Sequence, residues 1–323
     1  MRNTAALFSM LFFLVFPSAL FGAASPKAPV IDHGRVVSAP LIGWGNLFVP
    51  GLGATLRGEP GTGLQEAGTE IGLYYGGTFG VKEGNFGIDG SVNVPHSNHL
   101  GRPVLGQIMQ ELGLKYHFYN TFHHYQQAVL ASKQNREIDK LQPIYQGDLS
   151  DVLKAPFVWK NVSNTWVWPV IAVSTGYLLY SYKTTGITHY QNFRVSDADE
   201  NLFGVSQAIV IPVGGLIGEE TLFRGFIMRE TRSYTNSAVA ALILESAAFT
   251  ALHPSDLQVS AFASGILFGL MTNHFDGNIE PAIAAHFWVN VVSGLVTYWT
   301  LKREQGKSTP FAPPIVLQSS IPF

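Results

Sequence analysis

Five apolar segments of near-membrane length dominate the C-terminal half of this 323-residue chain, and they constrain its fold more than any other feature. They cover residues 165–182, 202–218, 237–252, 257–272 and 281–301. A helix that crosses a bilayer needs about 20 mostly apolar residues, and in lipid the backbone polar groups must bond within helices or closed barrels. We therefore expect an all-α fold, a polytopic transmembrane helix bundle with a polar, partly helical insert.

The composition agrees with a membrane protein. Hydrophobic residues make up 46% of the chain and charged residues only 13%, whereas soluble domains carry about 25% charge. The formal net charge of −2 gives no indication of a nucleic-acid partner. The absence of cysteine excludes disulfides, thiolate metal sites and a cysteine nucleophile.

The N-terminal half divides into three predicted regions. Residues 1–24 have the layout of a signal peptide or N-terminal anchor. Residues 41–80 form a glycine-rich, membrane-associated helical region, in which Gly68, Gly72 and Gly76 predict a small-residue packing stripe.

Residues 81–162 form a polar exported insert with amphipathic helices over 101–114 and 122–133. We expect its histidines on a solvated surface and place no chemistry there. Residues 165–302 form the transmembrane core. We expect a multi-pass protein of the cytoplasmic (inner) membrane, and the distribution of basic residues predicts that the insert lies outside.

Three polar motifs interrupt the apolar core. The first contains Glu219, Glu220 and Arg224. Ionisable groups at bilayer depth cost roughly 2.5–3.5 kcal/mol each, so they need a compensating role. Helical spacing places Glu220 and Arg224 on one face as an ion pair. Glu219 points elsewhere, and without a cationic partner it should have a raised pKa that suits a general base toward water.

The other two motifs supply further polar groups. Glu245, Phe249 and His253 fall on one helical stripe. His253 could help to activate or orient a water, and Glu245 could contact Arg224 or His253, or make a helix–helix hydrogen bond without a catalytic role. His286 and Asn290 are four residues apart, so their donor groups share a face suited to an oxyanion.

The three motifs together, Glu-Glu-x-x-x-Arg, Phe-x-x-x-His and His-x-x-x-Asn, resemble the CPBP family of CAAX-processing and bacteriocin-processing (Abi-like) membrane proteases. The resemblance covers residues 202–301 and implies a protease-like core. It implies an intramembrane endopeptidase that hydrolyses membrane-associated proteins or peptides and has the lipid bilayer, but no nucleic acid, as a partner.

The roles that the resemblance implies can be assigned residue by residue. Glu219 would activate the water, His253 would assist, and His286 with Asn290 would hold the oxyanion. The supporting residues are Glu220, Arg224, Phe249 and Glu245.

Alternatives remain open at this point. We favour no cofactor, but Glu219, His253 and His286 could supply a zinc site. The alternative function is a non-catalytic membrane immunity or scaffold protein of the same fold. A transporter is less favoured, because residues 202–301 have no second copy in the chain.

Overall fold

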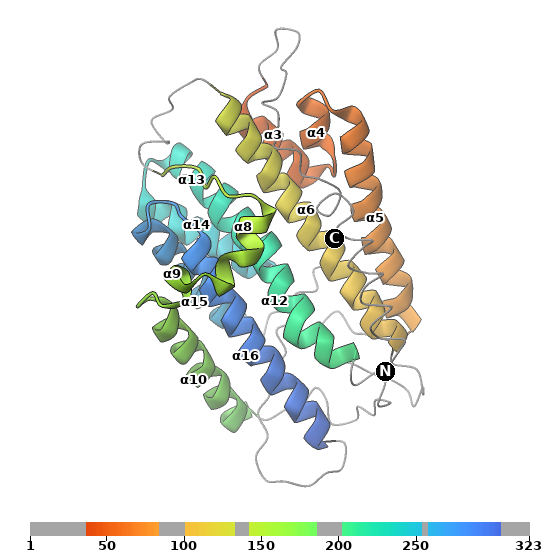
Figure 1. Cartoon of the computed structure of the whole chain (residues 1–323), viewed down its shortest axis with the longest axis vertical. Coiled ribbons are helices and arrows are strands. Elements are labelled where there is room, and N and C mark those ends of the chain that lie inside the picture. The colour runs from red at the N-terminus through yellow and green to blue at the C-terminus, as the bar shows by residue number, and fades with distance from the viewer. Residues whose placement is uncertain (1–36, 84–100, 133–141, 186–201, 254–257, 305–323) are drawn as a thin grey trace.

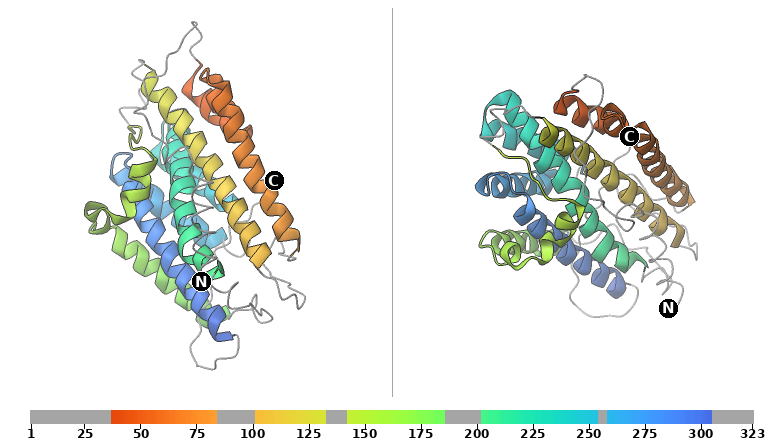
Figure 2. Two further views of the ribbon diagram at one scale, coloured as in Figure 1. Left: turned by 45° about the vertical axis from the view of Figure 1, so that its right-hand side comes forward. Right: turned by 45° about the horizontal axis from the view of Figure 1, so that its top comes forward.

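The computed structural model describes residues 37–83, 101–132, 142–185, 202–253 and 258–304. Every regular element within these ranges is a helix, which confirms the all-α prediction. The predicted signal peptide or anchor at 1–24 lies outside the described residues. Figures 1 and 2 show the long helices packed side by side, with their axes inclined in roughly the same direction.

A long helix, Leu202–Thr235, lies at the centre of the arrangement. It comprises a π-helical turn, η2 (Ser206–Val210), the short α12 (Ile211–Gly214), a second π-helical stretch, η3 (Gly215–Ile227), and α13 (Met228–Thr235). The N–H of Met228 donates to the carbonyl of Phe223, five residues earlier, as in a π-helix. Such wide turns are rare and are frequent at functional sites. The side chains of this stretch are therefore spaced somewhat differently around the axis than in a regular α-helix.

This central helix is the only one, among the residues that the structure describes, long and apolar enough to cross a membrane. The apolar part of α10 (Val167–Thr185) covers Val167–Tyr177, and α14 (Ala238–Ala251) is also shorter than a bilayer span. α15 (Gln258–His274) and α16 (Glu280–Glu304) complete the C-terminal half. The predicted segments are therefore helical where described, and one of them has the length and composition of a membrane span.

The N-terminal helices pack against one side of the central helix. They are α3 (Ala39–Phe48), α4 (Leu52–Leu56), α5 (Pro60–Glu83) and α6 (Gly101–Ala131). α6 lies between α5 and η3 and contacts both along its length (Figure 1). A short connection of α8 (Leu149–Lys154), η1 (Ala155–Phe157) and α9 (Trp159–Val162) leads from this side to α10 and α16.

The structure corrects the expectation of a solvated surface for the histidines near the middle of the chain. The expected helices at 101–114 and 122–133 are one continuous helix, α6, and its His117 and His124 are buried. The cause is that the polar face of α6 packs on the acidic face of α5, where Glu66 and Glu70 are also buried. His96 and His99 lie outside the described residues.

The predicted glycine stripe on α5 is a packing face at only one of its three positions. A methyl group built on Gly76 would lie 3.0 Å from Met109 Cε of α6. A methyl group built on Gly68 or Gly72 would meet no other atom within 4 Å. The two helices also approach closely at Gly77 and at Gly113 of α6, whose added methyl group would lie 3.0 Å from Leu73 Cβ. Small residues permit close packing on a face but do not determine which face is used.

The same pattern in α15 has the expected outcome. A methyl group on Gly265 would lie 2.9 Å from Ser246 Cβ, and one on Gly269 would collide with Leu242. Both contacts are with α14, so the predicted tight packing of these two helices is confirmed. This packing holds the end of α14 close to η3, where the polar motifs meet.

Candidate active site

The first motif lies on η3 and its arginine is enclosed completely. Arg224 Nη1 donates to Glu220 Oε1 at 3.1 Å, which confirms the predicted ion pair. Arg224 Nε lies 3.3 Å from Glu245 Oε1 on α14, so Glu245 pairs with the arginine. The guanidinium carbon lies 4.6 Å from the ring centre of Phe249 and 5.4 Å from that of Phe268. These aromatic faces add cation–π stabilisation to a buried charge.

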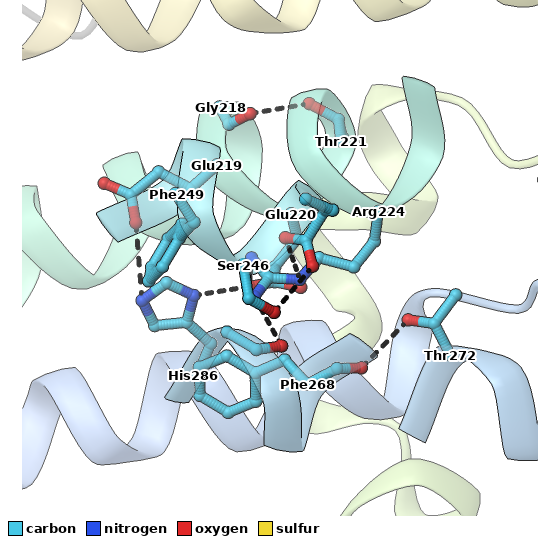
Figure 3. Close-up of polar contacts among 12 residues, drawn as sticks. Gly218, Glu219, Glu220, Thr221, Arg224, Ser246, Phe249, Phe268, Thr272 and His286 are labelled. Carbon is cyan, nitrogen blue, oxygen red and sulfur yellow. Dashed lines mark hydrogen bonds and ion pairs between the residues drawn. The ribbon is translucent and has the colours of Figure 1, made fainter. Parts of the chain in front are cut away.

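His286 connects the two adjacent acids of η3. Its Nδ1–H donates to Glu220 Oε1 at 2.6 Å, and its Nε2 lies 3.6 Å from Glu219 Oε2. Figure 3 shows the imidazole ring of His286 between the two carboxylates. The ring also stacks on Phe268, with centroids 4.8 Å apart and planes inclined by 17°. These contacts fix the ring orientation, so that Nε2 faces Glu219.

Asn290 lies one helical turn beyond His286 on α16, and both side chains are buried. Gly215 of η3 faces α16 at this point. A methyl group built on Gly215 would lie 2.9 Å from Asn290 Nδ2 and 3.3 Å from His286 Nε2. The two side-chain nitrogens therefore converge on the same place beside Gly215, as the shared face of 286 and 290 predicted.

His253 follows the end of α14 and faces the same cluster. Its Nδ1–H donates to the carbonyl of Phe249 at 2.8 Å, which leaves Nε2 as an acceptor in the neutral ring. The Phe249 and His253 rings lie 4.5 Å apart. His253 interacts electrostatically with Glu219. The structure thus brings all four predicted catalytic residues, from η3, α14 and α16, into one region.

Glu219 differs from the expectation in one respect, because it has a cationic partner. Lys115 Nζ of α6 donates to Glu219 Oε1 at 2.5 Å, and both side chains are buried. Lys115 also lies 3.6 Å from Glu111 on its own helix. An adjacent ammonium group stabilises an ionised carboxylate. The expectation of a raised pKa for Glu219 assumed a buried acid without a partner. That assumption is wrong.

Comparison with protein families identifies the part of the chain that carries these motifs. Residues 201–292 match the family model described as Type II CAAX prenyl endopeptidase Rce1-like. The resemblance to CPBP-type CAAX proteases is confirmed. This family consists of membrane-embedded proteases. The match covers less than a third of the chain, and no curated protein or solved structure matches.

Lys115 lies outside the Rce1-like segment and is not predicted from the sequence. It is separated from Glu219 by 104 positions, so no local spacing relates the two. One signal was present: Lys115 follows Glu111 by four residues in a helix whose neighbours are largely apolar or aromatic. A lone lysine on such a helix must find an acid when the helix is buried.

The donor set of the Rce1-like segment does not fit the alternative zinc site. Within the described ranges, no group of three or more histidine and carboxylate side chains is arranged to hold a metal ion. The Lys115 ammonium occupies Glu219 Oε1, where it would repel a metal cation. We therefore derive no chemical step through a metal at this position.

Proposed function

We propose that the chain is a multi-pass endopeptidase of the cytoplasmic (inner) membrane that hydrolyses peptide bonds of membrane-associated proteins or peptides. Glu219 activates the water, and His286 with Asn290 stabilises the oxyanion. The observation that carries this proposal is the convergence of His286 Nε2 and Asn290 Nδ2 beside Gly215, with Glu219 Oε2 3.6 Å from the same imidazole nitrogen. The Rce1-like match of residues 201–292 supports the reaction class.

The first chemical step is the addition of water to the scissile carbonyl. Glu219 accepts one proton from the water as its oxygen bonds to the carbonyl carbon. The carbonyl oxygen becomes an oxyanion, which accepts hydrogen bonds from Asn290 and from His286. His286 donates from Nε2 when the ring carries protons on both nitrogens, because Nδ1–H is already bonded to Glu220. His253, beside Glu219, orients the water.

The second step restores the carbonyl. The carbon–nitrogen bond breaks, and the leaving nitrogen takes the proton that Glu219 received. The products are a new carboxyl terminus and a new amino terminus. Glu220, Arg224 and Glu245 contact no reacting atom; they hold His286 and η3 in place through the ion pairs at 3.1 and 3.3 Å.

The surface of the helices supports a lipid environment for the core. Several large apolar side chains on α10, α14 and α15 are exposed: Val173, Val239, Ile243, Leu244, Val259 and Phe262. Trp159 and Trp168, near the start of α10, are also exposed. Tryptophan is enriched where a membrane meets water. The short helices α10 and α14 then lie in the membrane beside the central span, with lipid against these apolar faces.

The proposal is tested by comparing peptide termini in membrane fractions from cells that produce the wild-type protein or a Glu219→Ala variant. We expect a set of new termini that is present with the wild type and absent with the variant. Glu59→Gln, at an acid whose side chain is 42% exposed, is the matched control and should leave that set unchanged. Identical termini in wild type and Glu219→Ala would instead favour the non-catalytic immunity or scaffold function.

A further inference from the structure

A lysine from outside the Rce1-like segment occupies one oxygen of the proposed general base. Lys115 Nζ lies 2.5 Å from Glu219 Oε1, whereas Glu219 Oε2 is directed toward His286 Nε2 at 3.6 Å. The first contact is a direct hydrogen bond between opposite charges, and the second distance is too long for a direct hydrogen bond. The carboxylate therefore has one oxygen held by an ammonium group and the other turned to the reaction site.

The backbone of η3 is shaped to receive this lysine. A methyl group on Gly218 would lie 2.8 Å from Lys115 Cα and 2.9 Å from its carbonyl oxygen. A methyl group on Gly214, one turn earlier, would lie 3.1 Å from Lys115 Cγ. At Gly218, where the close atoms belong to the backbone of Lys115, only glycine permits this approach without a shift of backbone. Gly214, the last residue of α12, and Gly218 of η3 thus let α6 lie directly against the central helix, with the lysine stem along the glycine surface and its ammonium at Glu219.

The position of α6 is in turn fixed by α5. His117 Nδ1–H donates to Glu70 Oε2 at 2.8 Å, and Asn120 Nδ2 donates to Glu70 Oε1 at 2.7 Å. One turn further, His124 Nε2–H donates to Glu66 Oε2 at 2.8 Å. Buried hydrogen-bonded pairs of this kind restrict the rotation and sliding of a helix. The packing of α6 on α5 therefore fixes the position of the Lys115 backbone next to Glu219.

We propose that Lys115 is a positioning residue of the active site, which keeps the Glu219 carboxylate ionised and turned with Oε2 toward His286. The inference rests on the proposed function, and it makes α6 part of the catalytic unit although the family match begins at residue 201. Lys115 acts through Glu219 and does not touch the substrate.

The charged and titratable groups around Glu219 come from three elements. α6 supplies Lys115 and Glu111, α16 supplies His286, and His253 follows α14. Lys115 is the one with a direct hydrogen bond to Glu219. Removing its charge therefore changes the electrostatic environment of the carboxylate more than removing either neighbouring imidazole.

The experiment measures kcat/KM against pH for purified wild type, Lys115→Met and Lys115→Arg, on the peptide substrate found in the membrane-fraction comparison. An opposite charge within hydrogen-bond distance shifts carboxyl titration by about 1–3 units. We expect the acid limb of Lys115→Met to move to higher pH by about that amount, with kcat reduced and KM little changed. Lys115→Arg should return the limb toward the wild-type position. Lys154→Met, which removes an exposed lysine of α8, is the control.

Folding is checked separately, because Lys115→Met leaves Glu219 buried without a cation. Thermal unfolding in detergent should show a stability loss for Lys115→Met that is largely recovered in the double variant Lys115→Met/Glu219→Gln. An acid limb that does not move, a loss confined to KM, or a more active Lys115→Met would overturn the proposal. So would a double variant as unstable as the single one. A wild type without peptidase activity would instead contradict the proposed function.

Discussion

Two buried polar clusters of this molecule differ in how completely their hydrogen bonds are made. Between α5 and α6, both carboxylate oxygens of Glu70 accept hydrogen bonds, and His117 is bonded through both ring nitrogens. In the Rce1-like segment, Glu220 Oε2 has no hydrogen-bond partner within the described part of the chain, and Arg224 Nε and Glu245 Oε1 meet only as an ion pair at 3.3 Å. Buried polar groups without partners are uncommon and often mark a functional site.

The difference indicates that the α5–α6 cluster has a structural role, whereas the cluster of the Rce1-like segment has the features expected of an active site. The hydrogen bonds of Glu70 with His117 and Asn120 fix α6 against α5. The cluster on η3, α14 and α16 holds buried charges beside the proposed catalytic residues. The rings of Phe249 and Phe268 lie against Arg224. Lys115 connects the two clusters, because it lies on α6 and its ammonium group donates a hydrogen bond to Glu219.

The largest effect is expected where a buried charge supports the site. Arg224→Ala leaves Glu220 and Glu245 without their cation in a fully buried position. Breaking a buried pair in this way costs about 3–5 kcal/mol, so the variant should yield little folded protein. The measurement is the detergent-solubilised monodisperse yield and its thermal unfolding. Arg232→Ala, at a partly buried arginine of α13, is the control. Equal yields would show that the unsatisfied cluster contributes no more than a surface charge.

The next effect concerns catalysis without loss of fold. Asn290→Ala removes one proposed oxyanion donor, and loss of such a donor lowers kcat by about 10²–10³. Gly215→Ala keeps both donors and inserts a methyl group 2.9 Å from Asn290 Nδ2, so it should also reduce kcat. Steady-state kinetics beside thermal unfolding separates the two effects. Full activity in both variants would contradict an oxyanion site beside Gly215.

A smaller effect is expected in the polar cluster between α5 and α6. Glu70→Gln weakens the hydrogen bonds to His117 and Asn120, which involve a charged group and are worth about 1.5–3 kcal/mol. The free energy of unfolding should fall by about that amount. Glu59→Gln, a partly exposed acid with one ion pair, should change it by less than about 1 kcal/mol. Equal changes in the free energy of unfolding for the two variants would show that the hydrogen bonds of Glu70 contribute no more to stability than a surface ion pair.

The smallest effect tests which face of α5 is packed. Gly72→Ala places a methyl group in open space, and replacing glycine by alanine inside a helix stabilises by about 0.5–1 kcal/mol. Gly77→Ala places the same group 2.7 Å from Gln110 Cγ and 2.8 Å from its backbone nitrogen, so it should destabilise. Unfolding midpoints of the pair give the sign of each change. Opposite signs to those expected would show that the face of Gly68 and Gly72 is packed and that of Gly77 is not.

The features that could be predicted from the sequence are those that depend on neighbours along one helix. The Glu220–Arg224 pair and the shared face of His286 and Asn290 follow from a spacing of four residues, and both are present. The bounds of α14 differ by one residue at each end from the predicted 237–252. Local periodicity carries this information because it reports which side chains share a face.

The features that could not be predicted depend on contacts between distant segments. Nothing near Glu219 in the sequence indicates Lys115, since the contact exists only when α6 packs on η3. The burial of His117 and His124 has the same cause, because their acidic partners are on α5. Of the predicted stripe on α5, Gly76 packs on α6 whereas Gly68 and Gly72 do not, and the position of the partner helix decides this.

The most direct test of the account is the hydrolysis of a peptide substrate by purified protein in ¹⁸O-labelled water, with wild type and Glu219→Gln compared. The wild type should place one labelled oxygen in the new carboxyl terminus. Glu219→Gln, which retains size but cannot accept the proton, should lower kcat by about 10²–10⁴ while remaining folded. A folded Glu219→Gln protein that cleaves at the wild-type rate would contradict the role of Glu219 as the general base.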